Sequence, residues 1–155
     1  MITLKIGDKA PEFIGKDQDG NIICLSHFFS KKVVLYFYPK DNTLGCTAEA
    51  CNLRDNYQLL LDKNIVIIGV SADNEKSHLK FISKFKLPFP LLADTDKNIC
   101  NLYGVWGTKK FMGRTFDGIN RTTFIISEEA IIEAVFTKVN TYNHAQQILD
   151  ELKIK

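Results

Sequence analysis

The sequence predicts a mixed α/β fold, in which a central β-sheet is flanked by helices and preceded by an N-terminal β-hairpin. Two apolar runs, residues 33–38 and 65–71, have the composition of strands that are covered on both faces. A stretch with helical periodicity separates these runs. Helices between strands, together with a hairpin near each end of the chain, indicate a mixed sheet rather than a purely parallel one.

The first half of the chain predicts a hairpin, two buried strands and two helices, each from its own pattern. Asp19-Gly20 can supply the positive φ angles of a tight hairpin turn. Apolar residues every three or four positions predict the first helix, and Asp73 or Asn74 can cap the second. In chain order, the expected elements are a hairpin over residues 13–25, a central strand over 33–38 ended by Pro39, a helix over 46–61, a strand over 65–71, and a helix whose Leu79, Ile82 and Phe85 face inward.

The second half predicts shorter elements. Prolines at 88 and 90 end the preceding helix. The expected elements are a strand over residues 90–93, a short helix over 97–103, an irregular stretch containing Gly104, Gly107 and Gly113, a hairpin of strands 122–126 and 131–139, and a last helix capped by Thr141 or Asn143 with Ala145, Ile148, Leu149 and Leu152 on its inner face.

Length, composition and charge are those of an ordinary globular protein. The chain has 155 residues, of which 45% are apolar, and a formal net charge of +2. No repeat or linker divides it, so we expect one domain over residues 1–155. The basic residues are scattered, so we expect no nucleic-acid partner. The N-terminus lacks the apolar core of a signal peptide, and no run approaches the roughly 18 residues of a membrane span. We therefore expect a cytoplasmic protein with no membrane partner.

Cys46 and Cys51 are the first candidates for chemistry among the four cysteines. A chain of this length can bury roughly 68–70% of its surface, so it needs no disulfide for stability. In a reducing compartment a close cysteine pair is more often catalytic, redox-active or metal-binding than structural. Cys46 follows a buried strand and begins a helix, where the free N–H groups favour a thiolate. The alternative is that Cys46 is a small apolar residue of the core.

The spacing of the two cysteines restricts what they can do. Residues five apart on an α-helix have Cα atoms about 8.7 Å apart, whereas a disulfide requires roughly 4.4–6.8 Å. Oxidation of this pair therefore requires the first helical turns to unwind. The alternative is that Cys51 is merely a small residue beside the apolar stripe. A zinc site is disfavoured because the C-x4-C gap is too wide and no second pair of ligands is evident. We expect no metal and no cofactor.

Three further residues are candidates because of their positions relative to Cys46. Thr43 can present a hydroxyl to a substrate, or it can simply stabilise a turn. Arg121 opens an apolar strand, and it either extends to solvent or stabilises negative charge near the sulfur. Glu49 lies three residues after Cys46, where it can orient Arg121 or favour the helix start electrostatically.

These residues resemble a known pattern. Pro39, Thr43, Cys46 and Glu49, within YFYPKDNTLGCTAEAC, are similar to the peroxidatic motif of peroxiredoxins, and Cys51 resembles the resolving cysteine of the bacterioferritin comigratory protein (PrxQ) branch. The likeness extends over most of the chain, including residues 7–13, 103–107 and 118–124, and Arg121 falls at the active-site arginine of the family.

The resemblance implies a thioredoxin-like fold and reduction of hydrogen peroxide and organic hydroperoxides to water and alcohols. Cys46 would attack the peroxide and become a sulfenic acid, while Thr43 and Arg121 hold the substrate and Pro39 shields the sulfur. Cys51 would then form a disulfide with Cys46, and thioredoxin or a similar dithiol reductant would reduce it. We expect a monomer, with a dimer as the alternative.

The sequence departs from the family pattern at two places, and two other functions stay open. Leu44 replaces a proline common in this branch, and residues 127–130 lack the usual Asp- and Gly-containing turn. Cys24 and Cys100 match no role, and we expect them to be buried or neutral. A thioredoxin-like disulfide reductase would be expected to have a Cys-x-x-Cys motif, which is absent. A redox-switched binding protein would use the same cysteine pair to expose apolar residues of the helix.

Overall fold

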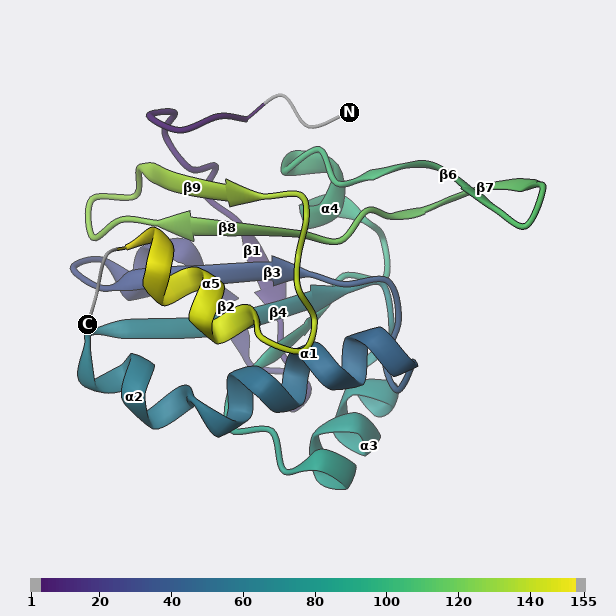
Figure 1. Ribbon diagram of the computed structural model, residues 1–155, viewed down its shortest axis with the longest axis horizontal. Coiled ribbons are helices and arrows are strands. Elements are labelled where there is room, and N and C mark those ends of the chain that lie inside the picture. Colours follow the sequence, from purple (N-terminus) through teal and green to yellow (C-terminus); the bar gives the residue numbers. More distant parts are fainter. Residues whose placement is uncertain (1–3, 153–155) are drawn as a thin grey trace.

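A five-stranded mixed sheet forms the centre of the computed structural model, which describes residues 4–152 except for the side chain of Phe111 (Figure 1). Its strands, in spatial order, are β5 (Leu91–Ala93), β4 (Ile65–Ser71), β3 (Lys32–Phe37), β8 (Thr122–Ile126) and β9 (Ile132–Phe136). Strand β3 pairs in parallel with β4 and antiparallel with β8. The predicted mixed sheet and the central position of β3 are confirmed.

Helices and a hairpin cover the two faces of the sheet, because β3 buries side chains on both. Val33, Leu35 and Phe37 enter one core, and Val34 and Tyr36 enter the other. The first core is covered by β1 (Ile14–Lys16), β2 (Ile22–Cys24), η1 (Leu25–Phe28) and α4 (Asn98–Leu102). The second is covered by α1 (Leu44–Asp55), α2 (Tyr57–Asp62), α3 (Glu75–Phe85) and α5 (His144–Glu151). Within the described residues, no helix has both the length and the apolar character of a membrane span.

The predicted helix over residues 46–61 is wrong at its start and in its middle. Helix α1 begins at Leu44, and Asn56 separates it from α2. The side-chain amide of Asn56 donates to the carbonyl oxygen of Asn52 at 2.8 Å, so it takes an acceptor that a continuing helix would use. The start at Leu44 places Cys46 third in the helix.

The stretch after Gly104, expected to be irregular, is an antiparallel hairpin of β6 (Trp106–Phe111) and β7 (Arg114–Ile119). Met112 and Gly113 have φ angles of 51° and 77°, which suit a two-residue hairpin turn. The prediction missed it because methionine seldom occupies such a turn and β7 is mostly exposed. The hairpin projects from the body of the protein (Figure 1).

Four smaller expectations were also corrected. In α3, Asn74 is the cap, and Ile82 and Phe85 pack against the second core as expected, but Leu79 is 42% exposed and the fully buried residues are His78 and Phe81. In the β1–β2 turn only Gly20 has a positive φ, because the Asp17 carboxylate accepts the N–H groups of residues 19 and 21 and closes a wider loop. Strand β9 ends at Phe136 rather than at residue 139, and Asn143 caps α5 by position without a side-chain hydrogen bond.

Two hydrogen bonds fix the C-terminal half of α1. The side-chain oxygen of Asn52 accepts the N–H of Ala145 in α5 at 2.8 Å. The guanidinium of Arg54 donates to the carbonyl oxygen of Phe85 in α3 at 2.8 Å. Leu53 lies between them and is fully buried. Residues 52–54 are therefore held by two neighbouring helices.

Candidate active site

The sulfur of Cys46 lies in the first turn of α1, just beyond the C-terminal end of β3. Thr43 is the residue before the helix, with extended backbone angles, and its carbonyl accepts the N–H of Thr47 at 2.8 Å. Cys46 is 1% exposed. The first N–H groups of a helix have no partner within it, so a charged or strongly polar group that enters this turn finds donors there.

Arg121 connects the sulfur to a buried carboxylate. One terminal nitrogen, Nη2, donates to the Cys46 sulfur at 3.3 Å, and the other, Nη1, donates to Glu49 Oε1 at 2.6 Å. The pairing of β3 with β8 explains how a residue 75 positions away arrives there. Phe37 at the end of β3 faces Thr122, so Arg121 stands just beyond the same edge of the sheet as Cys46.

Gly45 allows this close approach and was not among the predicted site residues. A Cβ atom on Gly45 would lie 3.1 Å from Arg121 Nη2, closer than most real Cβ contacts. In the sequence, the position of a glycine directly before the candidate nucleophile could have identified Gly45 as a site residue.

Thr43, Pro39 and Cys51 complete the set of predicted site residues. The Thr43 hydroxyl donates to the carbonyl oxygen of Lys40 at 2.9 Å, which leaves its oxygen free to accept a hydrogen bond. Pro39 is partly buried at the end of β3. Cys51 is partly buried in α1, and its thiol, like that of Cys46, is free. The structure thus brings Cys46, Glu49 and Arg121 into direct contact and holds Cys46 and Cys51 in one intact helix.

Comparison with known proteins identifies the family. Residues 6–135 match the AhpC/TSA family. Peroxiredoxin Bcp of Escherichia coli is 44% identical over 153 residues, which are 99% of this chain and 98% of that protein. The chain belongs to the AhpC/TSA family, among its Bcp/PrxQ peroxiredoxins.

Solved structures of this branch have the same fold. A cysteine-to-serine variant of Xylella fastidiosa PrxQ is 31% identical, with a TM-score of 0.90, over 97% of this chain and 96% of that one. The bacterioferritin comigratory protein of Xanthomonas campestris, described with its alkyl peroxide reduction activity, is 31% identical with a TM-score of 0.87 over 99% and 98%. The expected thioredoxin-like fold is confirmed, and membership supports a cysteine-dependent peroxidase.

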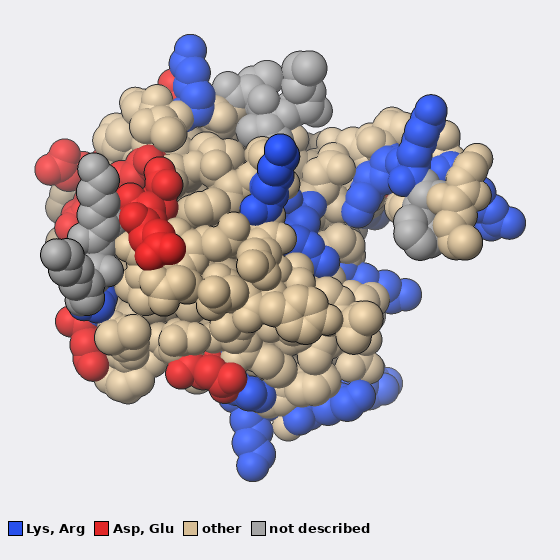
Figure 2. Space-filling view, in the orientation of Figure 1, with Lys and Arg blue, Asp and Glu red and all other residues tan. Residues whose placement is uncertain are grey.

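Two cationic side chains, Arg121 and Lys109, act on the sulfur of this peroxiredoxin. The pKa of Arg121 is raised, because the Cys46 and Glu49 charges outweigh the effect of burial. Lys109 reaches back from the projecting hairpin and donates to the carbonyl oxygen of Ile119 at 2.8 Å. Burial, together with the charge of Arg121, lowers the pKa of Lys109, while Cys46 acts in the opposite direction. Figure 2 shows Lys and Arg side chains on the hairpin and acidic side chains toward the other end of this face.

Glu49 is the most unusual carboxyl of the site. It is fully buried, and burial raises its pKa to about 7 although Arg121 opposes the rise. Its Oε2 has no hydrogen-bond partner among the described residues, and His144 Nε2 is 3.8 Å away. Burial also lowers the pKa of His144 to about 4, so this ring is neutral. Its Nδ1 lies 2.8 Å from Gln147 Oε1 and carries the proton, so Nε2 accepts from Thr123 and has no proton for Glu49.

The raised pKa of Glu49 predicts a pH-dependent stability. In the unfolded chain this carboxyl titrates near 4.5, whereas in the folded protein it titrates near 7. Folding therefore favours the protonated form, and the free energy of unfolding falls as the pH rises through this interval. At about 1.4 kcal/mol per pH unit the loss amounts to about 3 kcal/mol. We expect the difference in unfolding free energy between wild type and Glu49→Gln to change by about this amount in urea titrations of the reduced protein between pH 4.5 and 7.5.

The matched control is Glu129→Gln, which removes an exposed carboxyl from the β8–β9 turn. This variant should follow the pH dependence of the wild type. Parallel curves for wild type and Glu49→Gln would contradict the assignment of a raised pKa to Glu49.

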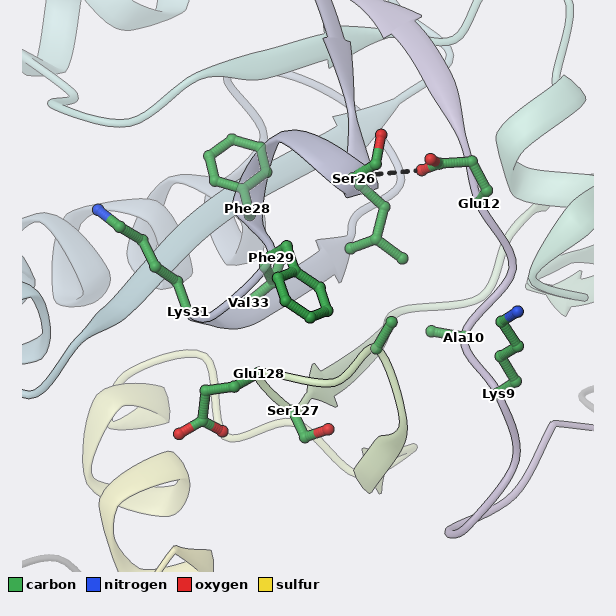
Figure 3. A pocket seen from close by; sticks show the side chains of 12 residues that line it. Lys9, Ala10, Glu12, Ser26, Phe28, Phe29, Lys31, Val33, Ser127 and Glu128 are labelled. Carbon is green, nitrogen blue, oxygen red and sulfur yellow. Dashed lines mark hydrogen bonds between the residues drawn. The ribbon is translucent and has the colours of Figure 1, made fainter.

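The remaining cysteines and a hollow beside η1 lie away from the site. Cys100 is buried, and burial together with Asp94 raises its pKa far above the ordinary value. Cys24 is partly buried, with its sulfur 3.2 Å from the Ser26 hydroxyl. A hollow of about 210 Å³ opens beside Phe28 and Phe29, near the start of β3, and none of the predicted site residues lines it (Figure 3).

Proposed function

We propose that Cys46 is the peroxidatic cysteine of this peroxiredoxin, and that it reduces hydrogen peroxide and organic hydroperoxides. The observation that carries the proposal is the Arg121 guanidinium, which contacts the sulfur with one nitrogen and Glu49 with the other. A fixed cation beside a buried thiolate stabilises the negative charge on the sulfur and the charge that develops on the departing oxygen.

The first step forms one bond and breaks one. The Cys46 thiolate attacks the terminal oxygen of the peroxide, a sulfur–oxygen bond forms, and the O–O bond breaks. The leaving oxygen takes a proton and departs as water or an alcohol, while the sulfur is oxidised to a sulfenic acid. Thr43 has an acceptor free for the peroxide O–H, because its own proton is donated to Lys40. Pro39 borders the loop and limits the access of water to the sulfur.

In the second step Cys51 resolves the sulfenic acid. Its sulfur attacks the Cys46 sulfur, a disulfide forms and water leaves. In the intact helix the two Cα atoms are about 8.7 Å apart, beyond the reach of a disulfide. The first turns of α1 must therefore unwind before this bond forms. Thioredoxin or a similar dithiol then reduces the disulfide, and because both cysteines belong to one chain the cycle can be completed in a monomer.

Peptide mapping tests this cycle. We expect one equivalent of hydrogen peroxide, added to the reduced protein, to produce a single Cys46–Cys51 disulfide. Cys24 and Cys100 should remain free because both lie away from the site. The measurement is intact mass and non-reducing peptide mapping after alkylation of every thiol. A Cys51→Ser variant serves as the comparison, and it should stop at the sulfenic acid of Cys46. Unchanged thiols, or a disulfide that omits Cys46, would overturn the proposal.

A redox-switched binding protein is less well supported. That function would require unwinding to expose Leu53 and Tyr57. Leu53 is fully buried between Asn52 and Arg54, and both of these residues are hydrogen-bonded to neighbouring helices. Unwinding of the first turns leaves that half of α1 in place.

A further inference from the structure

A buried hydrogen-bonded cluster lies beneath the loop that leads into α1. Its centre is Asp41, which is almost fully buried and stands two residues before Thr43. Its Oδ1 accepts from the Tyr38 hydroxyl at 2.6 Å. Its Oδ2 accepts from the Ser77 hydroxyl at 2.8 Å and lies 2.7 Å from His78 Nδ1. The loop is thereby joined to the first turns of α3.

The contact between Asp41 and His78 must contain a proton. His78 Nε2 lies 2.9 Å from the carbonyl oxygen of Leu92, which can only accept, so Nε2 carries a hydrogen. Nδ1 and the Asp41 carboxylate, at 2.7 Å, then share a second proton, and the contact is a charge-assisted hydrogen bond between two buried groups. Loss of either group would leave the other buried without this partner.

Asp73 holds the backbone of the same loop. Its Oδ2 accepts the Asp41 N–H at 2.8 Å and the Ser71 hydroxyl at 2.7 Å. The ligand atoms of Asp41, Asp73 and His78 lie within 4.8 Å of one another, as in a metal site. Asp41 Oδ2, Asp73 Oδ2 and His78 Nδ1 are all engaged in hydrogen bonds, and these bonds cross-link the loop to its neighbours. We call Asp41, Asp73, Ser77 and His78 the loop anchor.

We propose that the loop anchor is a positioning device that keeps the first turn of α1 wound while Cys46 reacts with peroxide. This role rests on the proposed function of Cys46. Thr43 is the residue before α1, its hydroxyl donates to the carbonyl oxygen of Lys40, and these two residues lie on either side of Asp41. Release of Asp41 frees this stretch and weakens the first turn, because the bond from Thr47 N–H to the Thr43 carbonyl loses its fixed acceptor.

The loop anchor thereby affects whether the sulfenic acid is oxidised to sulfinic acid or forms the disulfide. While the turn is wound, Cys51 is out of reach, and a second peroxide can oxidise the sulfenic acid to sulfinic acid with loss of water or alcohol. Once the turn unwinds, Cys51 forms the disulfide. A weaker anchor therefore slows the attack on the first peroxide and shifts the sulfenic acid from sulfinic acid to disulfide.

The test compares two substitutions of one side chain. In His78→Asn the amide nitrogen stands close to Nδ1 and can still donate to Asp41, whereas in His78→Gln it stands close to Nε2 and serves Leu92 instead. Stopped-flow and quenched-flow mass spectrometry measure the rate of Cys46 oxidation, and the hydrogen peroxide concentration at which half of Cys46 becomes sulfinic acid. We expect His78→Gln to slow the attack roughly tenfold and to raise that concentration roughly tenfold, the effect of one lost charge-assisted bond. His78→Asn should stay within about threefold of wild type.

Ser77→Ala is a milder variant that removes one donor to Asp41 and keeps the buried ring. It should shift both quantities in the same direction by roughly threefold. Lys84→Gln is the matched control, because Lys84 donates to Asn42 at 3.3 Å and joins the same loop to α3 at the exposed surface. This control should match wild type.

Each outcome has one meaning. If folded Ser77→Ala and His78→Gln divided the sulfenic acid between sulfinic acid and disulfide as the wild type does, the proposed role of the loop anchor would be overturned. Equal changes of the two measured quantities in His78→Asn and His78→Gln would overturn it as well. If the wild type formed no sulfenic acid at Cys46, the proposed function itself would fail. Circular dichroism confirms that each variant is folded before it is assayed.

Discussion

Substitution of Cys46 by serine is expected to lower peroxide consumption by at least about a thousandfold, because a serine hydroxyl is a far weaker nucleophile than a thiolate. The two side chains are similar in size, and the Cys46 position is closely packed at 1% exposure. The fold should therefore be retained. The measurement is the loss of hydrogen peroxide in the presence of a dithiol reductant.

Cys24→Ser is the control for this experiment. Cys24 is partly buried at the end of β2, beside Leu25, which belongs to the core on the opposite face of the sheet from that of Cys46. Its replacement should leave the rate unchanged. If Cys46→Ser consumed peroxide at the wild-type rate, another thiol would be the nucleophile.

Replacement of Arg121 by methionine should slow the attack on peroxide by roughly a hundredfold, the effect expected when one fixed donor to a developing oxyanion is removed. Arg121→Lys should react with peroxide at a rate between those of this variant and the wild type, because lysine keeps the charge but cannot bridge Cys46 and Glu49. The measurement is the second-order rate constant for oxidation of Cys46. Arg114→Met, an exposed substitution on the projecting hairpin, is the control.

The Arg121 variant also leaves a buried carboxyl without its partner. Removal of the guanidinium takes away the charge and the hydrogen bond that hold down the pKa of Glu49. Loss of stability could then be mistaken for loss of chemistry. The double variant Arg121→Met with Glu49→Gln also replaces the buried carboxyl, and it should remain as slow as the single variant. Recovery of the wild-type rate in the double variant would contradict a direct role for Arg121.

Local patterns predicted most elements of the fold, because burial and periodicity are properties of neighbouring residues. The run 33–38 is apolar on every position, so it identified the central strand without any tertiary information. The break at Asn56 and the hairpin at residues 106–119 were not predicted, because each depends on one local feature. The break depends on the side-chain hydrogen bond of Asn56, and the hairpin depends on the conformation of its turn.

The sequence proposed Cys46, Glu49 and Arg121 as candidates, but it left open whether Arg121 reaches the sulfur, and Gly45 was not among the candidates. The spacing of Cys46, Glu49 and Cys51 within a helix could be deduced from the sequence. The position of Arg121 depended on the register between β3 and β8. The loop anchor was missed entirely, because Asp41 and His78 are 37 positions apart and neither belongs to an apolar pattern.

The fixed C-terminal half of α1 has a consequence for where the sulfurs can go. Asn52 and Arg54 hold one end of the reactive segment, and Asp41 holds the other. Residues 42–51 are then a short tether between two fixed points, even when they are unwound. For short flexible tethers the effective concentration of one end near the other is on the order of millimolar. In the proposed cycle the sulfur of Cys51 thus stays confined around Cys46, and we expect bond formation within the chain to outcompete capture of a thiol from a second molecule.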